Sequence, residues 1–588
     1  MANINQKPSH RANLSKNGFD MSQRHPFTSS VGQLLPVFYD YLNPGDKIRI
    51  SANLFTRTQP MKSTAMARLT EHIEYFFVPF EQMFSLFGSV FYGIDDYNSS
   101  SLVKHNNLTM PFFKSDAVSA ALEAAYTSFS SSINRKVLTP DMMGQPRVYG
   151  ILRLSEMLGY GSLLLSNDNN LLPHADMSVF LFTAYQKIFN DFYRLDDYTS
   201  VQHKSYNVDY AQGQPITDNS MFELHYRPWK KDYFTNVIPN PYFSSVDNKS
   251  SFGGAGLFDR PVGLSITSFN FDGSDFLQAP SDLSTMENNQ PIFQELPVNL
   301  TSASSAGLSV SDLRYLYATD KLLRITQFAG KHYDAQTLAH FGKRVPQGVS
   351  GEVYYIGGQS QPLQISSVES TATTFDSGDV VGSVLGELAG KGYSQTGNQK
   401  DFSFEAPCHG VLMAIYSAVP EADYLDERID YLNTLIQSND FYKPEFDSLG
   451  MEPFPNYELD QYRMVGNNSR LGWRYRYSGL KSKPDLISGA FKYTLRDWVA
   501  VRNDSRYAED ESWWQSAAFM YIDPAYLDNI FELSFTPRLY QQQDSANVTY
   551  DGTFIDRSLV YQRDPLLHDL YIKCYKSSAM STYGLPNL

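Results

Sequence analysis

Apolar and polar residues alternate in a stretch that begins at residue 47. Ile48, Ile50, Ala52 and Leu54 are separated by polar residues, and this period of two predicts a half-buried strand. The preceding residues 43–46 read Asn-Pro-Gly-Asp, which is typical of a turn. The pattern therefore predicts a turn followed directly by a strand.

A second strand is predicted in the stretch LTEHIEYFFVPFEQMF at residues 69–84, and Pro79 is expected to end it. Side chains of a strand alternate between its two faces. One face then carries Ile73, Tyr75 and Phe77, and the other carries His72, Glu74, Phe76 and Val78. Nearly all residues after Glu74 are apolar or aromatic, so we expect a buried strand with a polar beginning.

Four stretches have the apolar period of a helix. The clearest is SVFLFTAYQKIFNDFYR at residues 178–194. A second begins at Ser115, a plausible N-cap before an apolar stripe, and a third begins near Ser309. A short fourth helix is expected to end at Gly342.

Two further regions of the sequence differ in composition and pattern. Residues 240–307 are rich in Gly, Ser, Asn, Asp and Pro, which predicts a long insertion dominated by loops. After residue 350, short strands are predicted in GEVYYIGG, PLQISSV, HGVLMAIYSAV, GAFKYTL and IFELSFTP. Many short strands, few helices and long loops predict a mainly β protein, an elaborated sandwich or barrel.

The composition adds an excess of aromatic residues. The 588 residues include 40 Tyr and 39 Phe but only 5 Trp. Tyr and Phe suit strands and also surfaces where chains pack together, so we expect both a large β core and assembly surfaces.

The net charge and the cysteines limit the possible functions. A formal charge of −15 argues against a chain that wraps nucleic acid over its whole surface, but it leaves room for a local basic patch. Only Cys408 and Cys574 are present, so a reducing compartment is expected rather than a disulfide framework. The sequence has neither a signal peptide nor an apolar run of about 20 residues, so we expect folding in a cytoplasm and no membrane.

His72 and Glu74 are the strongest candidates for chemistry. They would lie about 6.6 Å apart along the strand, but a catalytic metal needs at least three protein ligands and no third is evident nearby. The sequence holds no H-E-x-x-H, Walker A or G-x-S-x-G motif. We therefore expect no catalytic residues, no metal and no cofactor. Glu71, His72 and Glu74 are expected to adjust a contact between subunits.

The first 30 residues are mildly basic. The cations are Lys7, Arg11, Lys16 and Arg24, against a single acidic residue. We expect an arm rather than a packed element.

Several short sequence blocks carry a family resemblance. In the N-terminal third they are FDMS, VGQLLPV, NPGD, FTRTQPM and EYFFVPF, between residues 19 and 80. Further along they are AYQKIFNDFYR, DYFTNVIPNP, SVSDLRYLYATDKLL, HFG and YIGGQSQPLQ. In this order and spacing they resemble major capsid proteins of the Microviridae, in particular those of gokushovirus-like phages. Residues 63–66, Ser-Thr-Ala-Met where the family has Pro-Val-Met, mark a divergent lineage.

The resemblance implies a fold and a function. The fold would be an eight-stranded antiparallel jelly roll, a viral β-sandwich whose large loop insertions contain several helices. The chain would be a structural protein without catalysis, repeated sixty times in a T=1 icosahedral shell around the circular single-stranded DNA genome of a bacteriophage.

Three regions are expected from the resemblance. Residues 1–30 would form a basic arm in the shell interior, where Lys7, Arg11, Lys16 and Arg24 are candidate contacts to DNA phosphates. A solvated arm, or one that binds a neighbouring subunit, is an alternative of nearly equal weight. Residues 31–239 and 311–588 would form the jelly-roll core. Residues 240–310 would form a variable surface insertion, a protrusion near the three-fold axes that contributes to host attachment.

The resemblance also implies partners and a location. The partners would be other copies of the chain around two-, three- and five-fold axes, the single-stranded DNA genome on the inner face, an internal scaffolding protein, a DNA pilot protein and a host surface receptor. The chain would be found in the virion, after assembly in the bacterial host cytoplasm.

Two other functions compete with this one. A carbohydrate-binding or glycan-degrading surface protein would fit aromatic-rich strands, but it predicts a secretion signal and a convergent acid pair, and neither is apparent. A nucleic-acid enzyme is disfavoured by the net charge and by the lack of a metal-binding carboxylate cluster in the sequence.

Overall fold

The computed structural model divides the chain into two compact units, Met1–Asn240 with Pro346–Leu588, and Pro241–Val345. The residues that the structure describes are mainly 15–92, 109–114, 146–160, 176–211, 215–239, 332–346, 350–369, 388–396, 400–424, 428–438, 440–447, 450–459, 470–502 and 564–582, with scattered residues at 117–121, 318–329 and 520–531.

One antiparallel sheet of ten strands dominates the described part of the first unit. Its path is β1-β16-β4-β9-β8-β5-β11-β3, with β2 paired to β16 and β10 paired to β4. The strands are β1 (Asn17–Asp20), β2 (Gln23–Ser29), β3 (Leu35–Leu42), β4 (Lys47–Thr58), β5 (Leu69–Pro79), β8 (Tyr354–Glu369), β9 (Leu388–Gln395), β10 (Phe402–Glu405), β11 (Gly410–Pro420) and β16 (Leu566–Ser578).

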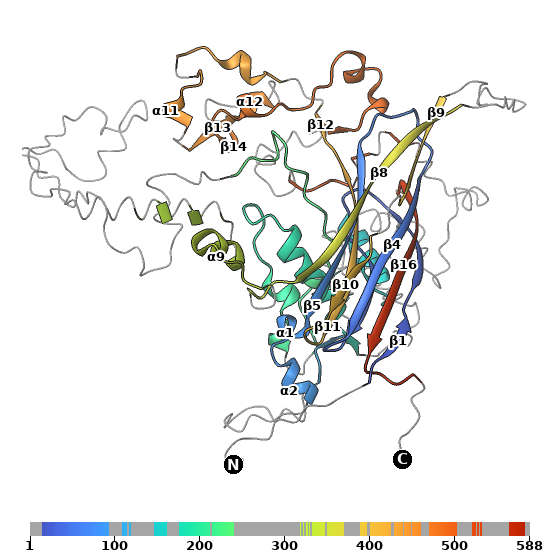
Figure 1. Ribbon diagram of the computed structural model, residues 1–588. Helices are drawn as coiled ribbons and strands as arrows, with labels where there is room; N and C mark the ends of the chain where they lie inside the picture. The colour runs from blue at the N-terminus through green and yellow to red at the C-terminus, as the bar shows by residue number, and fades with distance from the viewer. Residues whose placement is uncertain are drawn as a thin grey trace, which may run out of the picture. The chain divides into compact units, whose positions relative to one another are not determined.

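The sheet curls around its own core, and β8 is the strand that turns the corner. The first part of β8 pairs with β5 as far as Leu363, and the rest pairs with β9 from Gln364 onward. In Figure 1, β8 (yellow) crosses from β5 toward β9, while β4 (blue) and β16 (red) run side by side. The protein is therefore mainly β, as predicted, and the curled antiparallel sheet is consistent with a jelly roll that carries insertions.

The strands predicted in the first third are confirmed. In β4, Ile48, Ile50, Ala52 and Leu54 are all buried, so the alternating pattern does mark one face. Strand β5 ends at Pro79 and helix α1 begins at the next residue. The runs GEVYYIGG and PLQISSV fall in one long strand, β8, and HGVLMAIYSAV forms β11.

Two segments differ from their predictions. The run GAFKYTL, predicted as a strand, forms a 3-10 helix over Gly489–Lys492. Gly489 has a φ of 71°, a left-handed conformation that breaks an extended chain. Strand β16 was absent from the predictions, although its Leu566, Leu570 and Ile572 belong to a buried row of period two.

The predicted N-terminal arm is wrong for residues 17–29. Strands β1 and β2 both pair with β16, at the edge of the main sheet. Phe27 anchors this segment, because its ring centroid lies 4.5 Å from that of His568 and 5.2 Å from that of Tyr416. Residues 1–14 lie outside the described residues. These two edge strands bring the described sheet to ten strands.

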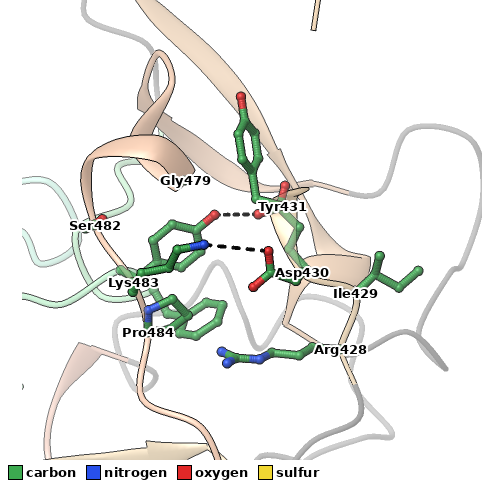
Figure 2. Close-up of a pocket in the computed structure, with 11 residues that line it drawn as sticks. Arg428, Ile429, Asp430, Tyr431, Gly479, Ser482, Lys483 and Pro484 are labelled. Carbon is green, nitrogen blue, oxygen red and sulfur yellow. Dashed lines mark hydrogen bonds and ion pairs between the residues drawn. The ribbon is translucent and has the colours of Figure 1, made fainter. Parts of the chain in front are cut away.

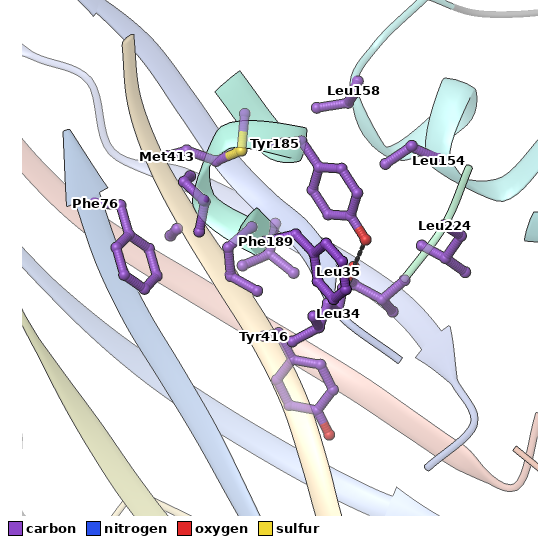
Figure 3. Close-up of a cluster of buried hydrophobic side chains, with 14 of the residues drawn as sticks. Leu34, Leu35, Phe76, Leu154, Leu158, Tyr185, Phe189, Leu224, Met413 and Tyr416 are labelled. Atoms are coloured by element: carbon purple, nitrogen blue, oxygen red, sulfur yellow. Dashed lines mark hydrogen bonds between the residues drawn. The ribbon is translucent and has the colours of Figure 1, made fainter. Parts of the chain in front are cut away.

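A helical layer covers the half of the sheet that contains β5 and β11. Helix α6 (Phe180–Ile188) continues into a π-helix, η2 (Phe189–Tyr193), and confirms the helix predicted in residues 178–194. All nine residues of α6 are buried. Figure 3 shows Tyr185 of this helix beside Leu34, whose carbonyl accepts a 3.0 Å hydrogen bond from the Tyr185 hydroxyl.

This layer explains the sequence of β11. Every residue from Gly410 to Pro420 is buried, so both faces of the strand are covered. A strand covered on both faces reads as a continuous apolar run rather than an alternating one. The core is therefore two-sided here, with the curled sheet on one face of β11 and the helices on the other.

The second unit, described by itself, contains helix α9 (Tyr333–Phe341). Gly342 follows it with a φ of 68°, and its N–H donates to the carbonyl of Leu338. The predicted helix end at Gly342 is thus confirmed. The helices predicted after Ser115 and Ser309 fall mostly outside the described residues.

The remaining elements are short. They form three two-stranded ladders, β6–β7, β12–β15 and β13–β14, and a set of short helices and turns. Their bounds are α2 (Phe87–Tyr92), β6 (Phe112–Phe113), α5 (Pro146–Met157), β7 (Met177–Ser178), α7 (His203–Tyr206), η3 (Asp209–Ala211), η4 (Ser220–Phe222), β12 (Asp423–Tyr424), η9 (Tyr431–Thr434), α11 (Pro444–Asp447), β13 (Met451–Pro455), η10 (Asn456–Glu458), β14 (Arg470–Tyr475), α12 (Ser478–Lys481), η13 (Arg496–Trp498) and β15 (Val501–Arg502), with α1 at Phe80–Met83. None of the helices in the described residues is long and apolar enough to span a bilayer.

Two leucines of β16 provide a matched test of this fold. Leu570 is fully buried, whereas Leu567 on the opposite face is 38% exposed. Leu570→Ala should lower the free energy of unfolding by about 2–5 kcal/mol through lost burial and a cavity. Leu567→Ala should change it by about 0.5 kcal/mol or less. Urea titration of both purified variants measures the difference, and equal effects would contradict the assigned strand faces.

Candidate functional site around strand β5

The carboxylate of Glu71 lies inside the curled sheet and is fully buried. Its Oε1 accepts hydrogen bonds from the hydroxyls of Thr56 (2.7 Å) and Tyr416 (2.8 Å). Its Oε2 accepts one from Nε2 of Gln361 at 2.9 Å. A buried carboxylate is tolerated when hydrogen bonds replace its lost hydration, and three donors from three different strands do so here.

His568 of β16 completes this polar network. Its Nδ1 lies 2.8 Å from Oγ1 of Thr56, and its Nε2 lies 2.7 Å from Oγ of Ser29. Because the Thr56 hydroxyl already donates to Glu71, it can only accept from His568, so the proton sits on Nδ1 and Nε2 accepts from Ser29. Burial, together with the charge of Arg153, lowers the pKa of His568 well below its ordinary value, and the ring is neutral.

Glu74 lies on the opposite face of β5, toward the helical layer. Its Oε2 accepts from Nη1 of Arg227 at 2.8 Å and also from the hydroxyl of Tyr193. The Arg227 guanidinium also lies over the Tyr193 ring, 5.3 Å from its centroid, and donates to Ser417 of β11. The ion pair therefore fastens the end of helix η2 to strands β5 and β11.

His72 lies beside Glu74 on this same face. Burial and the nearby positive charge of Arg227 lower the pKa of His72, and the negative charge of Glu74 opposes them. The resulting pKa is about 4. At neutral pH the ring is uncharged. It therefore adds no positive charge next to Arg227.

These positions correct one expectation. Glu71, His72 and Glu74 were expected to adjust a contact between subunits, but Glu71 is enclosed within its own chain and Glu74 is paired with Arg227 of the same chain. Glu71 and Glu74 therefore hold parts of their own subunit together.

A second buried ion pair lies near the network. Arg153 of helix α5 and Asp564 are 1% and 2% exposed, and their Nη1 and Oδ1 atoms are 2.9 Å apart. Asp564 also accepts hydrogen bonds from Thr28 and Ser30. The pair joins α5 and the residues before β16 to the end of β2. Nothing local in the sequence connects Arg153 with Asp564, because 410 residues separate them.

The structure places two of the four candidate DNA-binding cations. Lys16 donates to the carbonyl of Gly45, and Arg24 forms a 2.8 Å pair with Asp569 of β16, with both side chains partly exposed. Lys7 and Arg11 lie outside the described residues. The described part of the segment therefore distributes its charge along the edge of the sheet rather than gathering it in one place.

A small pocket lies between residues 428–431 and 479–484 (Figure 2). Lys483 points toward Asp430 there, with 3.9 Å between Nζ and Oδ1. The cavity measures about 10 Å³, room for about one water molecule and not for a substrate. The described residues also contain no group of three or more His, Cys, Asp and Glu side chains placed to hold a metal ion.

Comparison with known proteins gives consistent matches. The sequence profile of a family described as "Capsid protein (F protein)" matches residues 8–138 and 170–502. The chain is 20% identical to "Capsid protein VP1" of Chlamydia phage 1 over 84% of this chain and 87% of that protein. It is 22% identical to "Capsid protein VP1" of Bdellovibrio phage phiMH2K over 95% and 93% of the two chains. It is 23% identical to "Capsid protein VP1" of Spiroplasma virus 4 over 58% and 66%.

The buried carboxylate can be tested by substitution. Glu71→Gln replaces one acceptor oxygen by an NH2 group that faces a donor, so it should lower the free energy of unfolding by about 1–3 kcal/mol. Glu405→Gln is the control, because Glu405 pairs with Lys47 at the surface and its side chain is 55% exposed. The control should cost about 1 kcal/mol or less. Chemical denaturation of both variants measures the free energy of unfolding. A Glu71→Gln variant as stable as the wild type would show that the network does not need the carboxylate.

The lowered pKa of His72 predicts a dependence of stability on pH. An unfolded His binds a proton near pH 6.5, whereas folded His72 does so only near its pKa of about 4. Its contribution to stability is therefore complete above pH 6.5 and is lost as the pH falls toward 4. His72→Gln should flatten the fall of unfolding free energy between pH 6 and pH 4 by at most about 1.4 kcal/mol per pH unit. Denaturant titrations at several pH values measure this slope, and an unchanged slope would contradict the assignment.

Proposed function

Because the chain belongs to the capsid protein (F protein) family, whose profile covers well over half of it, we propose that sixty copies form a T=1 icosahedral shell around a circular single-stranded DNA genome. The chain is a phage major capsid protein, and its place is the virion. The resemblance to Microviridae capsid proteins is thereby confirmed. Membership of this family makes it a structural protein and not an enzyme.

The collinear match to the family profile is the observation that carries the proposal. Self-assembly follows from the family, and a closed shell of identical subunits requires point-group symmetry. Sixty copies in a T=1 lattice are the simplest icosahedral arrangement. The subunit also folds around its own core, which leaves its surface available for contacts with other copies.

Exposed apolar side chains support such contacts. Eight of those in the described residues lie between residues 432 and 495, where Ile436 is 83% exposed, Leu486 71% and Tyr493 69%. The same segment also exposes Leu432, Phe441, Tyr442, Leu480 and Leu495. Grouped exposed apolar residues mark interaction sites, and aromatic residues are enriched in interfaces between chains. The segment fits a contact with neighbouring copies around the symmetry axes.

The remaining parts of the proposal concern the inner and outer faces. Residues 1–30 face the interior, where Lys7, Arg11, Lys16 and Arg24 contact DNA phosphates. Residues 240–310 form a variable protrusion near the three-fold axes and contribute to binding of a host surface receptor. Assembly takes place in the bacterial cytoplasm with an internal scaffolding protein, and a DNA pilot protein joins the particle.

Particles purified from infected host cells test the assembly. Image reconstruction should show sixty copies of the chain in T=1 symmetry, and nuclease treatment should leave a protected circular single-stranded DNA. Another symmetry, or particles filled with double-stranded DNA, would overturn the proposal. Soluble monomers under all conditions, together with glycan hydrolysis, would favour the competing carbohydrate-active function.

The basic segment is tested by substitution rather than deletion, because β1 and β2 belong to the sheet. Lys7→Gln with Arg11→Gln should lower the yield of DNA-filled particles severalfold while empty shells still form, since each lost cation weakens phosphate binding. Lys204→Gln with Lys230→Gln is the control, because both lysines are exposed, Lys230 by 73%, and both lie outside the basic segment and outside residues 432–495. Sedimentation separates full from empty particles. Equal losses in both double variants would argue against a specific role of the segment.

A further inference from the structure

The outward face of strand β16 carries aromatic and charged side chains in alternation. Tyr571 and Tyr575 are 45% and 46% exposed, and Lys573 lies exposed between them. The buried row of the same strand points into the core, so these side chains are turned away from it. Nearly half of each tyrosine side chain is therefore accessible from outside the subunit.

The neighbouring strands extend this pattern across the sheet. In the register of β16 with β4, Tyr575 lies opposite Arg49 and Leu567 lies opposite Arg57. Arg57 in turn lies opposite Tyr393 of β9, which is 47% exposed. We define the outer β16–β4 face as the outward side chains of these three strands and their edge neighbours: Lys47, Arg49, Asn53, Phe55, Arg57, Leu567, Asp569, Tyr571, Lys573, Tyr575, Lys391, Tyr393 and Arg24.

Two cations of this face lie over aromatic rings. The guanidinium carbon of Arg57 is 5.1 Å from the centroid of the Phe55 ring, and Nζ of Lys573 is 5.6 Å from that of Tyr575. Such pairs hold a cation and a flat apolar surface side by side. The rings and the cations are therefore available to one ligand at the same time.

The charge of this face differs in sign from that of the whole chain. Arg24, Arg49 and Lys47 are paired with Asp569, Asp401 and Glu405. Asp20 is a further carboxylate, opposite Tyr575 in the register of β1 with β16. Among the described residues, the six cations of the face therefore outnumber these four acids: Arg24, Lys47, Arg49, Arg57, Lys391 and Lys573. The face is thus locally positive on a chain whose formal net charge is −15.

We propose that the outer β16–β4 face binds single-stranded DNA, with bases stacked on Tyr571, Tyr575 and Tyr393 and phosphates held by Arg57 and Lys573. The proposal rests on the proposed function, because it assumes that the enclosed genome is single-stranded. Proteins that bind single strands without sequence preference combine stacking aromatics with a positively charged track, and a sheet face can carry both. Tyr571 and Tyr575 are four residues apart on one strand, about 13 Å, so each has room for its own base.

The charge on this face favours DNA over another copy of the chain. The fully buried centre of a contact between proteins is depleted in charged residues, whereas cations occupy every strand of this face. Single-stranded DNA offers phosphates and unstacked bases together, and double-stranded DNA offers only the phosphates.

Binding of the purified chain to a fluorescent oligothymidylate, measured at several salt concentrations, tests the proposal. Tyr571→Ala and Tyr575→Ala should each weaken binding about 5- to 150-fold, since a stacked base contributes about 1–3 kcal/mol, and they should leave the salt dependence unchanged. Arg57→Gln and Lys573→Gln should each reduce the slope of log affinity against log salt by about 0.7. A duplex of equal charge should compete poorly.

A matched control uses another exposed tyrosine and lysine. Tyr210→Ala and Lys204→Gln alter side chains outside the sheet, where Tyr210 is 44% exposed and Lys204 is exposed, and neither should change binding or its salt slope. Thermal unfolding of each variant checks that the fold is retained. A purely structural role of the face would not separate affinity from salt slope in this way.

The outcomes distinguish failure of this proposal from failure of the proposed function. Particles filled with single-stranded DNA whose content is unchanged in Tyr571→Ala and Tyr575→Ala, with unchanged oligonucleotide affinity, would overturn the proposal and leave the function intact. Variants that bind the oligonucleotide normally but no longer assemble would identify the face as a contact between copies and also overturn it. Wild-type particles without single-stranded DNA would overturn the proposed function itself.

Discussion

The pairing of β16 with β4 is the interaction on which the rest of the subunit depends. Twelve register pairs, from Leu566 opposite Thr58 to Ser577 opposite Lys47, join segments near the two ends of the sequence. Closing a loop of this length costs entropy, and the sheet recovers the cost by burying the inner faces of both strands. The pairing also brings His568 beside Thr56, so His568 joins the hydrogen-bond network of Glu71 only when the two strands are in register.

Features that depend on neighbouring residues could be predicted from the sequence. Strand β4 follows from the period of its apolar residues, α6 from its helical period, and the end of α9 from Gly342. The mainly β class follows from many such strands. The period of β16 was as clear as that of β4, and its buried row could have been found with the same pattern.

Features that depend on residues far apart in the sequence could not be predicted. The partners of Glu71 come from β4, β8 and β11, and no spacing in the sequence connects them. Arg24 looked like a free cation of a basic arm because its partner, Asp569, lies 545 positions later. The outer β16–β4 face could not be predicted for the same reason. Its aromatic and basic residues lie on one surface only because of the register of three strands.

The late position of β16 in the chain has a consequence for synthesis. The ribosome releases the N-terminal strands first, so β4 remains without this neighbour until β16 emerges. A chain that stops before residue 566 keeps an open edge, and open edges join other strands indiscriminately. Pairing with Leu566–Ser578 closes this edge of β4, and it can do so only long after β4 itself has left the ribosome.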